Sequence, residues 1–165
     1  MIEQDYIMRL ISMLTAVIVK LIDQRKRREF PEAVSTIDNA CKHLLGADIA
    51  VVRALSDSQL IEFFGHDPNM GPPKCYALGV LLQEKAALDR TMGKEWDASL
   101  NEQKACSLLL EALREMDKPL EPEHLSRIEE SIRNLTRLEL PPHVVRKVEW
   151  YHTWRGRAEN VKHSS

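Results

Sequence analysis

Glycine and cysteine are scarce in this chain of 165 residues, and their scarcity excludes two kinds of site. The six glycines form no phosphate-binding loop, because Gly71 and Gly79 lack both the companion glycines and the lysine-serine pair that such a loop requires. The three cysteines, Cys41, Cys75 and Cys106, are odd in number, far apart and set within apolar helical patterns. We therefore expect reduced thiols in the core, as in a cytoplasmic protein.

A strong net charge and a long hydrophobic run are also missing. The formal net charge is −2 at pH 7, so the chain has no overall positive field to attract nucleic acid. The apolar run over residues 10–19 is too short for a membrane-spanning helix, which needs about twenty residues. Acidic residues, Glu3 and Asp5, precede it in place of the basic start of a signal peptide. We expect no membrane span and a cytoplasmic location.

Apolar periodicity predicts a single all-helical domain. Apolar residues make up 44% and charged residues 29% of the chain, which is typical of a globular protein. Sustained alternation with a period of two is absent, whereas apolar residues recur at three- and four-residue steps. We expect about six to eight helices in stacked antiparallel hairpins. The domain is predicted to cover residues 1–161, followed by a frayed polar tail at 162–165.

Proline, glycine and capping residues set the predicted helix ends. Pro31 suits a first helical turn, and Gly46 supplies a left-handed stop. Two serines have the spacing of a capping box: Ser56 with Gln59, and Ser99 with Glu102. The predicted helices cover residues 2–28, 31–45, 49–54, 60–64, 73–92, 97–116, 122–135 and 143–161. We expect the first two of these to form one hairpin, and 73–92 with 97–116 to form another.

Two of the predicted helices carry the same spacing of small and large apolar residues: Ala33, Ile37 and Ala40 in one, and Ala105, Leu109 and Ala112 in the other. This spacing resembles the second helix of a tetratricopeptide repeat, and Leu78-Gly79 with Leu82 resembles the first. The two motifs lie 72 residues apart, whereas that family repeats about every 34 residues. The resemblance implies tetratricopeptide-like stacking of hairpins rather than a regular repeat array, and ordinary helix-packing alanines are the alternative.

The opening segment QDYIMRLI, residues 4–11, resembles the start of an uncharacterised family of Firmicutes-type bacterial proteins. The resemblance implies a tetratricopeptide-like helical fold over most of the chain. It implies no activity, cofactor or site residue.

Residues with catalytic or metal-binding chemistry do not converge in the sequence. Cys41 and His43 are two positions apart and point to different faces of a helix, so they cannot easily share a metal ion. Glu129 and Glu130 are adjacent and belong to a charged, solvated helix face. We expect no catalytic residue, no cofactor and no metal, and the chain is predicted not to be an enzyme.

Residues 65–73 form the clearest break between helices, because they include three prolines and two glycines. We expect no regular structure there. His66 and Asp67 are the most site-like pair in this loop, since loops carry function and histidine titrates near neutral pH. Aspartate before proline is also common turn chemistry, which favours a structural role.

The last predicted helix interleaves aromatic and basic residues. The candidate interaction residues are Arg146, Lys147, Trp150, Trp154, Arg155 and Arg157. In one interpretation, this mixture stacks on bases and binds phosphates. In the other, the helix caps the end of a hairpin stack, because Val144, Val148 and Tyr151 recur at helical spacing. We favour the capping interpretation.

These patterns favour a noncatalytic helical module that binds a protein or peptide partner. Stacked hairpins form grooves that accept a peptide or a helix, and apolar residues on the first helix would allow a homodimer. The alternative is a small regulatory protein that binds nucleic acid through its last helix, which the net charge disfavours. An enzyme or ligand sensor that uses residues 65–73 is the third hypothesis.

Overall fold

A computed structural model describes residues 2–116, 121–135 and 139–164, and this part of the chain contains eight α-helices and no strand. The helices are α1 (Ile2–Lys26), α2 (Phe30–Leu45), α3 (Ile49–Ala54), α4 (Asp57–Phe64), α5 (Gly71–Thr91), α6 (Glu95–Glu115), α7 (Pro122–Leu135) and α8 (Pro142–His163). The predicted all-helical fold is confirmed. No helix of the described residues is long and apolar enough to cross a membrane.

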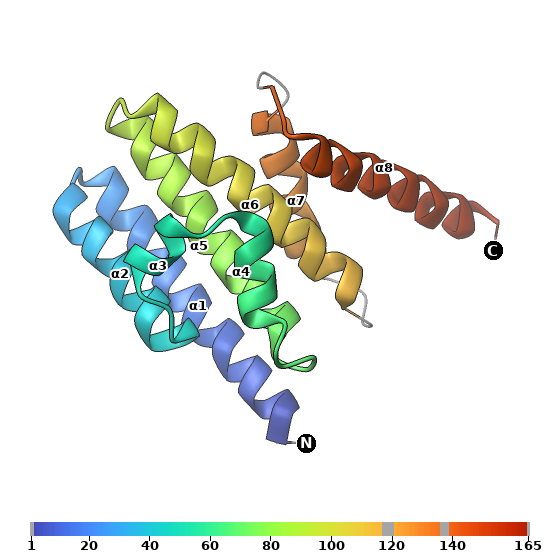
Figure 1. Cartoon of the computed structure of the whole chain (residues 1–165), viewed down its shortest axis with the longest axis horizontal. Coiled ribbons are helices and arrows are strands. Elements are labelled where there is room, and N and C mark those ends of the chain that lie inside the picture. The colour runs from blue at the N-terminus through green and yellow to red at the C-terminus, as the bar shows by residue number, and fades with distance from the viewer. Residues whose placement is uncertain (1, 117–120, 136–138, 165) are drawn as a thin grey trace.

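The α5–α6 hairpin forms the centre of the molecule (Figure 1). The α1–α2 hairpin packs against α5, while α7 and α8 pack against α6. The short helices α3 and α4 connect the two hairpins, and α4 contacts both α5 and α6. Both predicted hairpins are therefore present.

The α5–α6 crossing explains the role of Gly79. Residues 75–83 of α5 are all buried, because α5 has the α1–α2 hairpin on one side and α6 on the other. A Cβ atom at Gly79 would lie 2.8 Å from Cγ of Leu109 and 3.3 Å from the carbonyl oxygen of Ala105. The missing side chain therefore lets α5 and α6 approach closely at this point. Leu109 and Ala105, two residues of the α6 spacing motif, are themselves fully buried here.

The equivalent motif of α2 also lies in the core, where α2 packs on α1 and α5: Ala33, Ile37 and Ala40 are all buried. Gly46 ends α2 in the left-handed conformation with φ of 65°, as predicted. Ser56 and Gln59 form the predicted capping box at the start of α4.

The capping box predicted for Ser99 and Glu102 is wrong. α6 begins at Glu95, directly after a tight turn at Gly93, whose φ of 76° is in the left-handed region. Ser99 therefore lies inside the helix, and its hydroxyl donates to the carbonyl of Glu95. Glu102 is fully buried and contacts side chains of α5 and α7 instead of capping α6.

The predicted break at residues 65–73 is too long. α5 begins at Gly71, so Pro72 and Pro73 lie in its first turn, where the backbone N–H groups have no helical acceptor and proline is tolerated. α8 continues through Lys162 and His163, two residues beyond the predicted end of the last helix. Ser165 lies outside the described residues.

The three cysteines are free and buried, as predicted. Burial raises the pKa of each thiol to about 12. Thiols that resist ionisation are weak nucleophiles and weak metal ligands. Their role here is to pack in the core.

Candidate interaction site

An open groove of about 740 Å³ runs between α1 and α2. Its lining from α1 is Met13, Ala16, Val17, Lys20 and Gln24, and its lining from α2 is Pro31, Glu32, Ser35, Thr36, Asn39, Ala40, His43 and Leu44. The buried side chains of Ala40 and Leu44 form the floor. Exposed polar side chains, among them Lys20 and Asn39, form the rim.

Small side chains create this groove. Ala16 and Ser35 both line it, and their side chains are too short to fill the space between two packed helices. The larger residues of the hairpin, such as Leu14 and Ile37, are buried in the core. The space between α1 and α2 is therefore left available to another group.

The two ends of the groove differ. At the end near the hairpin turn, the Thr36 hydroxyl donates to Oε1 of Gln24 at 2.9 Å, and Gln24 is buried. This hydrogen bond joins the two helices, and the lining of the groove continues past it to Pro31 and Glu32. The other end lies between Met13 and Leu44, where α2 stops and α1 continues past it (Figure 1).

α1 carries four large apolar residues that are exposed: Tyr6 (46%), Met8 (64%), Met13 (48%) and Val19 (64%). Isolated exposed apolar residues are normal, but four on one helix are unusual. No large apolar residue of α5 is comparably exposed. The first helix therefore carries apolar residues that lie outside the protein core, as predicted. One of them, Met13, also lines the groove.

Two of the six candidate residues on α8 take part in ion pairs within the chain. Nζ of Lys147 lies 3.3 Å from Oε2 of Glu111 on α6. Nε of Arg155 lies 3.5 Å from Oε1 of Glu129 on α7. Both pairs attach α8 to its neighbours, which leaves these cations less available to a phosphate.

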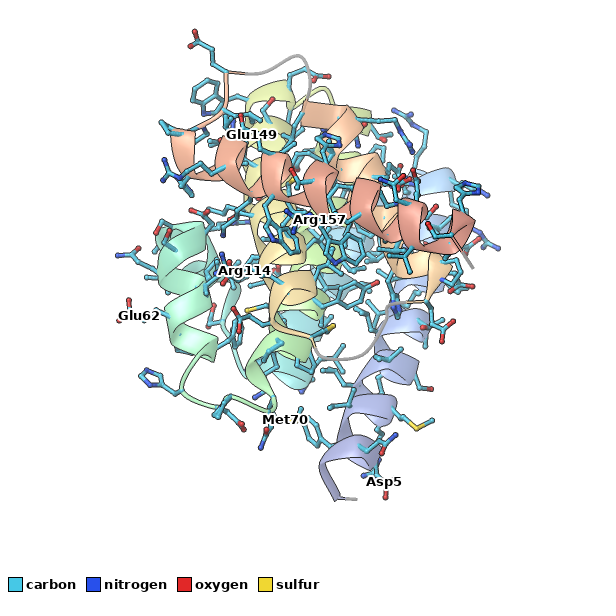
Figure 2. All side chains as sticks on the ribbon, turned by 90° about the vertical axis from the view of Figure 1, so that its right-hand side faces the viewer. Asp5, Glu62, Met70, Arg114, Glu149 and Arg157 are labelled. Atoms are coloured by element: carbon cyan, nitrogen blue, oxygen red, sulfur yellow. The ribbon has the colours of Figure 1, made fainter. Side chains whose placement is uncertain are left out.

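The aromatic residues of α8 are used in the same way. Trp150 and Trp154 stack with ring centroids 6.1 Å apart, and both are partly buried against the core. Arg146 and Arg157 are exposed, and Figure 2 labels Arg157 on α8. Four of the six candidate residues thus help to attach α8, which agrees with the capping interpretation. Nucleic-acid binding stays a prediction.

A polar cluster that the sequence analysis did not anticipate joins α4, α6 and α8. Oδ2 of Asp57 accepts a hydrogen bond from the Ser107 hydroxyl at 2.5 Å and lies 2.7 Å from Nε2 of His143. Lys147 donates to the same hydroxyl at 2.8 Å. Burial alone would raise the pKa of Asp57, but the hydrogen bonds from Ser107 and His143 lower it below its ordinary value.

This cluster contains the residue types of a serine-nucleophile site, but its hydrogen bonds do not suit one. Ser107 is fully buried, and its proton faces Asp57, a weak base because its pKa is low. Nζ of Lys147 contacts Glu111 and donates to the Ser107 hydroxyl, so it is a donor to this serine rather than an acceptor of its proton. The cluster is suited to fixing α8 in place. Its members are far apart in sequence, so no local spacing could reveal them.

His66 and Asp67 are not brought together with other site-like groups. Oδ1 of Asp67 accepts hydrogen bonds from the backbone N–H groups of Asn69 and Met70, at 3.0 and 3.1 Å. This is the turn chemistry expected for aspartate before proline. Asp67 borders a small cavity of about 260 Å³ next to Cys75, and the exposed His66 lies outside that cavity.

Among the described residues, no group of three His, Cys, Asp or Glu is placed to hold a metal ion. Cys41 is fully buried, while His43 is exposed at the rim of the groove, so the two point to different faces as predicted. Glu130 is exposed as predicted. Glu129 is only half-exposed, and it accepts a hydrogen bond from the hydroxyl of Tyr151, so its predicted role as a solvated residue is wrong.

The most deeply buried carboxylates, Asp89 and Glu102, lie where α5, α6 and α7 meet, and both are 0% exposed. Glu102 accepts a hydrogen bond from Asn134 at 3.0 Å and lies 3.5 Å from Arg90. Burial raises the pKa of Glu102, and these partners offset only part of that effect. The partners of both carboxylates belong to neighbouring helices or the same helix, so the cluster cross-links the core rather than opening to a ligand.

Comparison of the chain with protein-family models, with curated proteins and with solved structures finds no match in any of the three. The geometry described above is therefore the basis for assigning a site. The α1–α2 groove combines an open shape with an apolar floor and a polar rim. The sequence contains no sign of it, because Ala16, Ser35 and Asn39 are ordinary helix residues until α1 and α2 pack together.

Proposed function

We propose that this chain is a noncatalytic protein–protein interaction module, and that its α1–α2 groove binds a helix. The observation that carries the proposal is the shape of the groove: open along α1, floored by short or buried side chains and rimmed by polar ones. Amphipathic helices bind in grooves of this kind by placing apolar residues on the floor.

The chemistry of the groove supports the same function. Met13 and Val17 supply apolar contacts beside the buried Leu44, while Lys20 and Glu32 offer charges of both signs at the rim. The potentially catalytic residues of the described chain lie elsewhere, and their hydrogen bonds are used within the fold. A partner recognised here would be held by contact area rather than transformed.

A photo-crosslinking residue placed at Asn39, on the rim of the groove, tests the proposal. The matched control carries the same residue at Glu130, which is exposed on α7. We expect Asn39 to capture a helical segment that the control does not capture. A synthetic peptide of that segment should bind the purified chain, as measured by fluorescence anisotropy.

A groove-filling substitution, Ala16→Trp, completes the test. It should abolish both the crosslink at Asn39 and binding of the peptide, while circular dichroism shows the helical content unchanged. Equal capture at Asn39 and Glu130, or peptide binding that survives Ala16→Trp, would show that the groove is not the binding site.

A further inference from the structure

The outward face of α1 has the periodicity of a helix-pairing seam. Its exposed residues recur at steps of four and three: Asp5, Arg9, Ser12, Ala16, Val19 and Asp23. This is the 3.5-residue period by which two helices stay in contact along their length. Arg27 follows four residues after Asp23, and residues 5–27 span about 33 Å when helical. We refer to these seven residues as the α1 seam.

The centre of the α1 seam is built for close approach. Ala16 is small, and the side chains beside it are the exposed Met13 and Val19. Ala16 and Met13 also line the groove, so a helix on the α1 seam would contact the rim of α2 as well. All seven residues of the α1 seam are exposed, and the first turns of α1, with Asp5, project away from the helical bundle (Figure 2).

When two copies of the α1 seam run antiparallel, their opposite charges face each other. We infer that α1 pairs antiparallel with α1 of a second copy of the chain, about a two-fold axis at Ala16. In that arrangement Asp5 lies opposite Arg27 of the second copy, and Arg9 lies opposite Asp23. The two-fold axis repeats both pairs at the other end, so four oppositely charged pairs flank an apolar centre.

Other arrangements of the same two helices bring like charges together. A parallel pair would place each charged residue of the α1 seam next to its own copy. A shift of the antiparallel pair by one helical turn would place Arg9 opposite Arg27 in one direction, or Asp5 opposite Asp23 in the other. Like charges that face each other across an interface are destabilising. The charge pattern therefore selects one orientation and one register.

An ion pair already present in the single chain fits this arrangement. Nε of Arg27 lies 3.2 Å from Oδ1 of Asp23, and both side chains are exposed. In the dimer, Arg27 would lie between Asp23 of its own copy and Asp5 of the second copy. Asp23 would lie between Arg27 of its own copy and Arg9 of the second copy. Charges would alternate along each end of the interface, and an ionic network is more stabilising than an isolated surface pair.

This inference rests on the proposed function, since it names a second copy as the partner of the α1–α2 face. It predicts that the chain is a dimer whose dissociation constant rises with salt concentration, because exposed ionic contacts are screened. Sedimentation velocity over a range of protein and salt concentrations measures both.

Charge reversal tests the register directly. One variant, Arg9→Glu with Arg27→Glu, makes every charge of the α1 seam acidic, and a second, Asp5→Lys with Asp23→Lys, makes every charge basic. Each variant alone should dimerise at least about tenfold more weakly than the unmodified chain, which would correspond to about 1.4 kcal/mol. Mixing the two should restore a dimer that contains one copy of each.

A crosslink locates the two-fold axis. Ala16→Cys places two thiols next to each other across the axis and should form a disulfide-linked dimer under mild oxidation. Ser126→Cys, on an exposed part of α7, is the matched control and should stay monomeric on a non-reducing gel. The native cysteines are buried and should not react in either variant.

An unmodified chain that stays monomeric at high concentration, or charge variants that dimerise as well as the unmodified chain, would overturn the inference. The proposed function would still stand if Asn39 captured a different helical protein and Ala16→Trp abolished that capture. If Asn39 captured nothing and the chain were monomeric, both would be wrong.

Discussion

α1 and α5 are the first helices of the two hairpins, yet their surroundings are opposite. α5 is covered by the α1–α2 hairpin on one side and α6 on the other, so residues 75–83 are buried without interruption. α1 buries one stripe, which includes Leu10, Leu14 and Ile18, and leaves Met13 and Val19 in solvent. A helix at the centre of a bundle uses its whole surface for stability, whereas a helix at the edge has a free surface on which to bind.

The largest expected difference between the two helices is in core packing. Leu81→Ala on α5 removes a fully buried side chain and should lower the free energy of unfolding by about 2–5 kcal/mol, because a cavity is left behind. Met13→Ala on α1 removes a side chain that is 48% exposed and should change the free energy of unfolding by about 0.5 kcal/mol or less. Urea denaturation measures both. Equal losses would mean that the edge of α1 is packed as tightly as α5.

A glycine on each type of helix gives the next contrast. Gly79→Val on α5 would force a side chain into Leu109 and should lower the free energy of unfolding by about 1–3 kcal/mol. Gly156→Ala on α8 meets nothing within 4 Å and should stabilise the protein by about 0.5–1 kcal/mol, because alanine favours a helix. Thermal unfolding of the two variants should therefore shift in opposite directions.

The attachment of α8 extends the comparison to the other edge of the molecule. Lys147→Met removes the ion pair with Glu111 and the hydrogen bond to Ser107, and should cost about 1–3 kcal/mol. Hydrogen exchange should increase mainly in α8, while α5 stays protected. Arg146→Met, at an exposed neighbouring position, is the control and should leave exchange in α8 unchanged.

The smallest effect concerns pH at a contact on the central helix. Burial lowers the pKa of His124, and the nearby carboxylates Glu123 and Glu121 offset only part of this shift. The centroid of the His124 ring lies 4.8 Å from that of Tyr76 on α5. A histidine whose pKa is lower in the folded chain than in the unfolded chain stabilises the fold at pH values above its unfolded pKa, which is about 6.5. This stabilisation is lost as the pH falls from the unfolded pKa through the folded pKa.

Urea denaturation at about pH 7.5 and about pH 5.5 should therefore show a lower stability at the acidic value. His124→Gln should reduce this pH dependence. Asp57, whose pKa is lowered, adds a further loss of stability at more acidic pH, so the variant should still unfold in strong acid. A pH dependence unchanged by His124→Gln would assign the effect to other groups.

Signals within a few residues of one another predicted most of the fold. Gly46 ended α2 where predicted, and Ser56 with Gln59 opened α4, because both features depend on adjacent backbone groups. The same kind of signal failed at Ser99 with Glu102. There the spacing of a capping box is present, but a turn at Gly93 had already started the helix, and burial gives Glu102 a different role.

The candidate site was predictable only in outline. Exposed apolar residues on the first helix, and the interleaved residues of the last, were visible in the sequence. The ion pairs that Lys147 and Arg155 form were not visible in the sequence, because their partners, Glu111 and Glu129, lie on other helices. Ser107 and Asp57 gave no signal at all, since they are 50 residues apart along the chain.

The sequence by itself determined that this protein is helical, where its helices begin and end to within a few residues, and which stripe of each helix is apolar. These properties follow from backbone hydrogen bonds and side-chain periodicity over a few residues. Only the tertiary structure decided that α5 is enclosed, that α1 has a free face and that a groove lies beside it. Such features depend on which helices pack together, so they arise from contacts between residues that are distant in the chain.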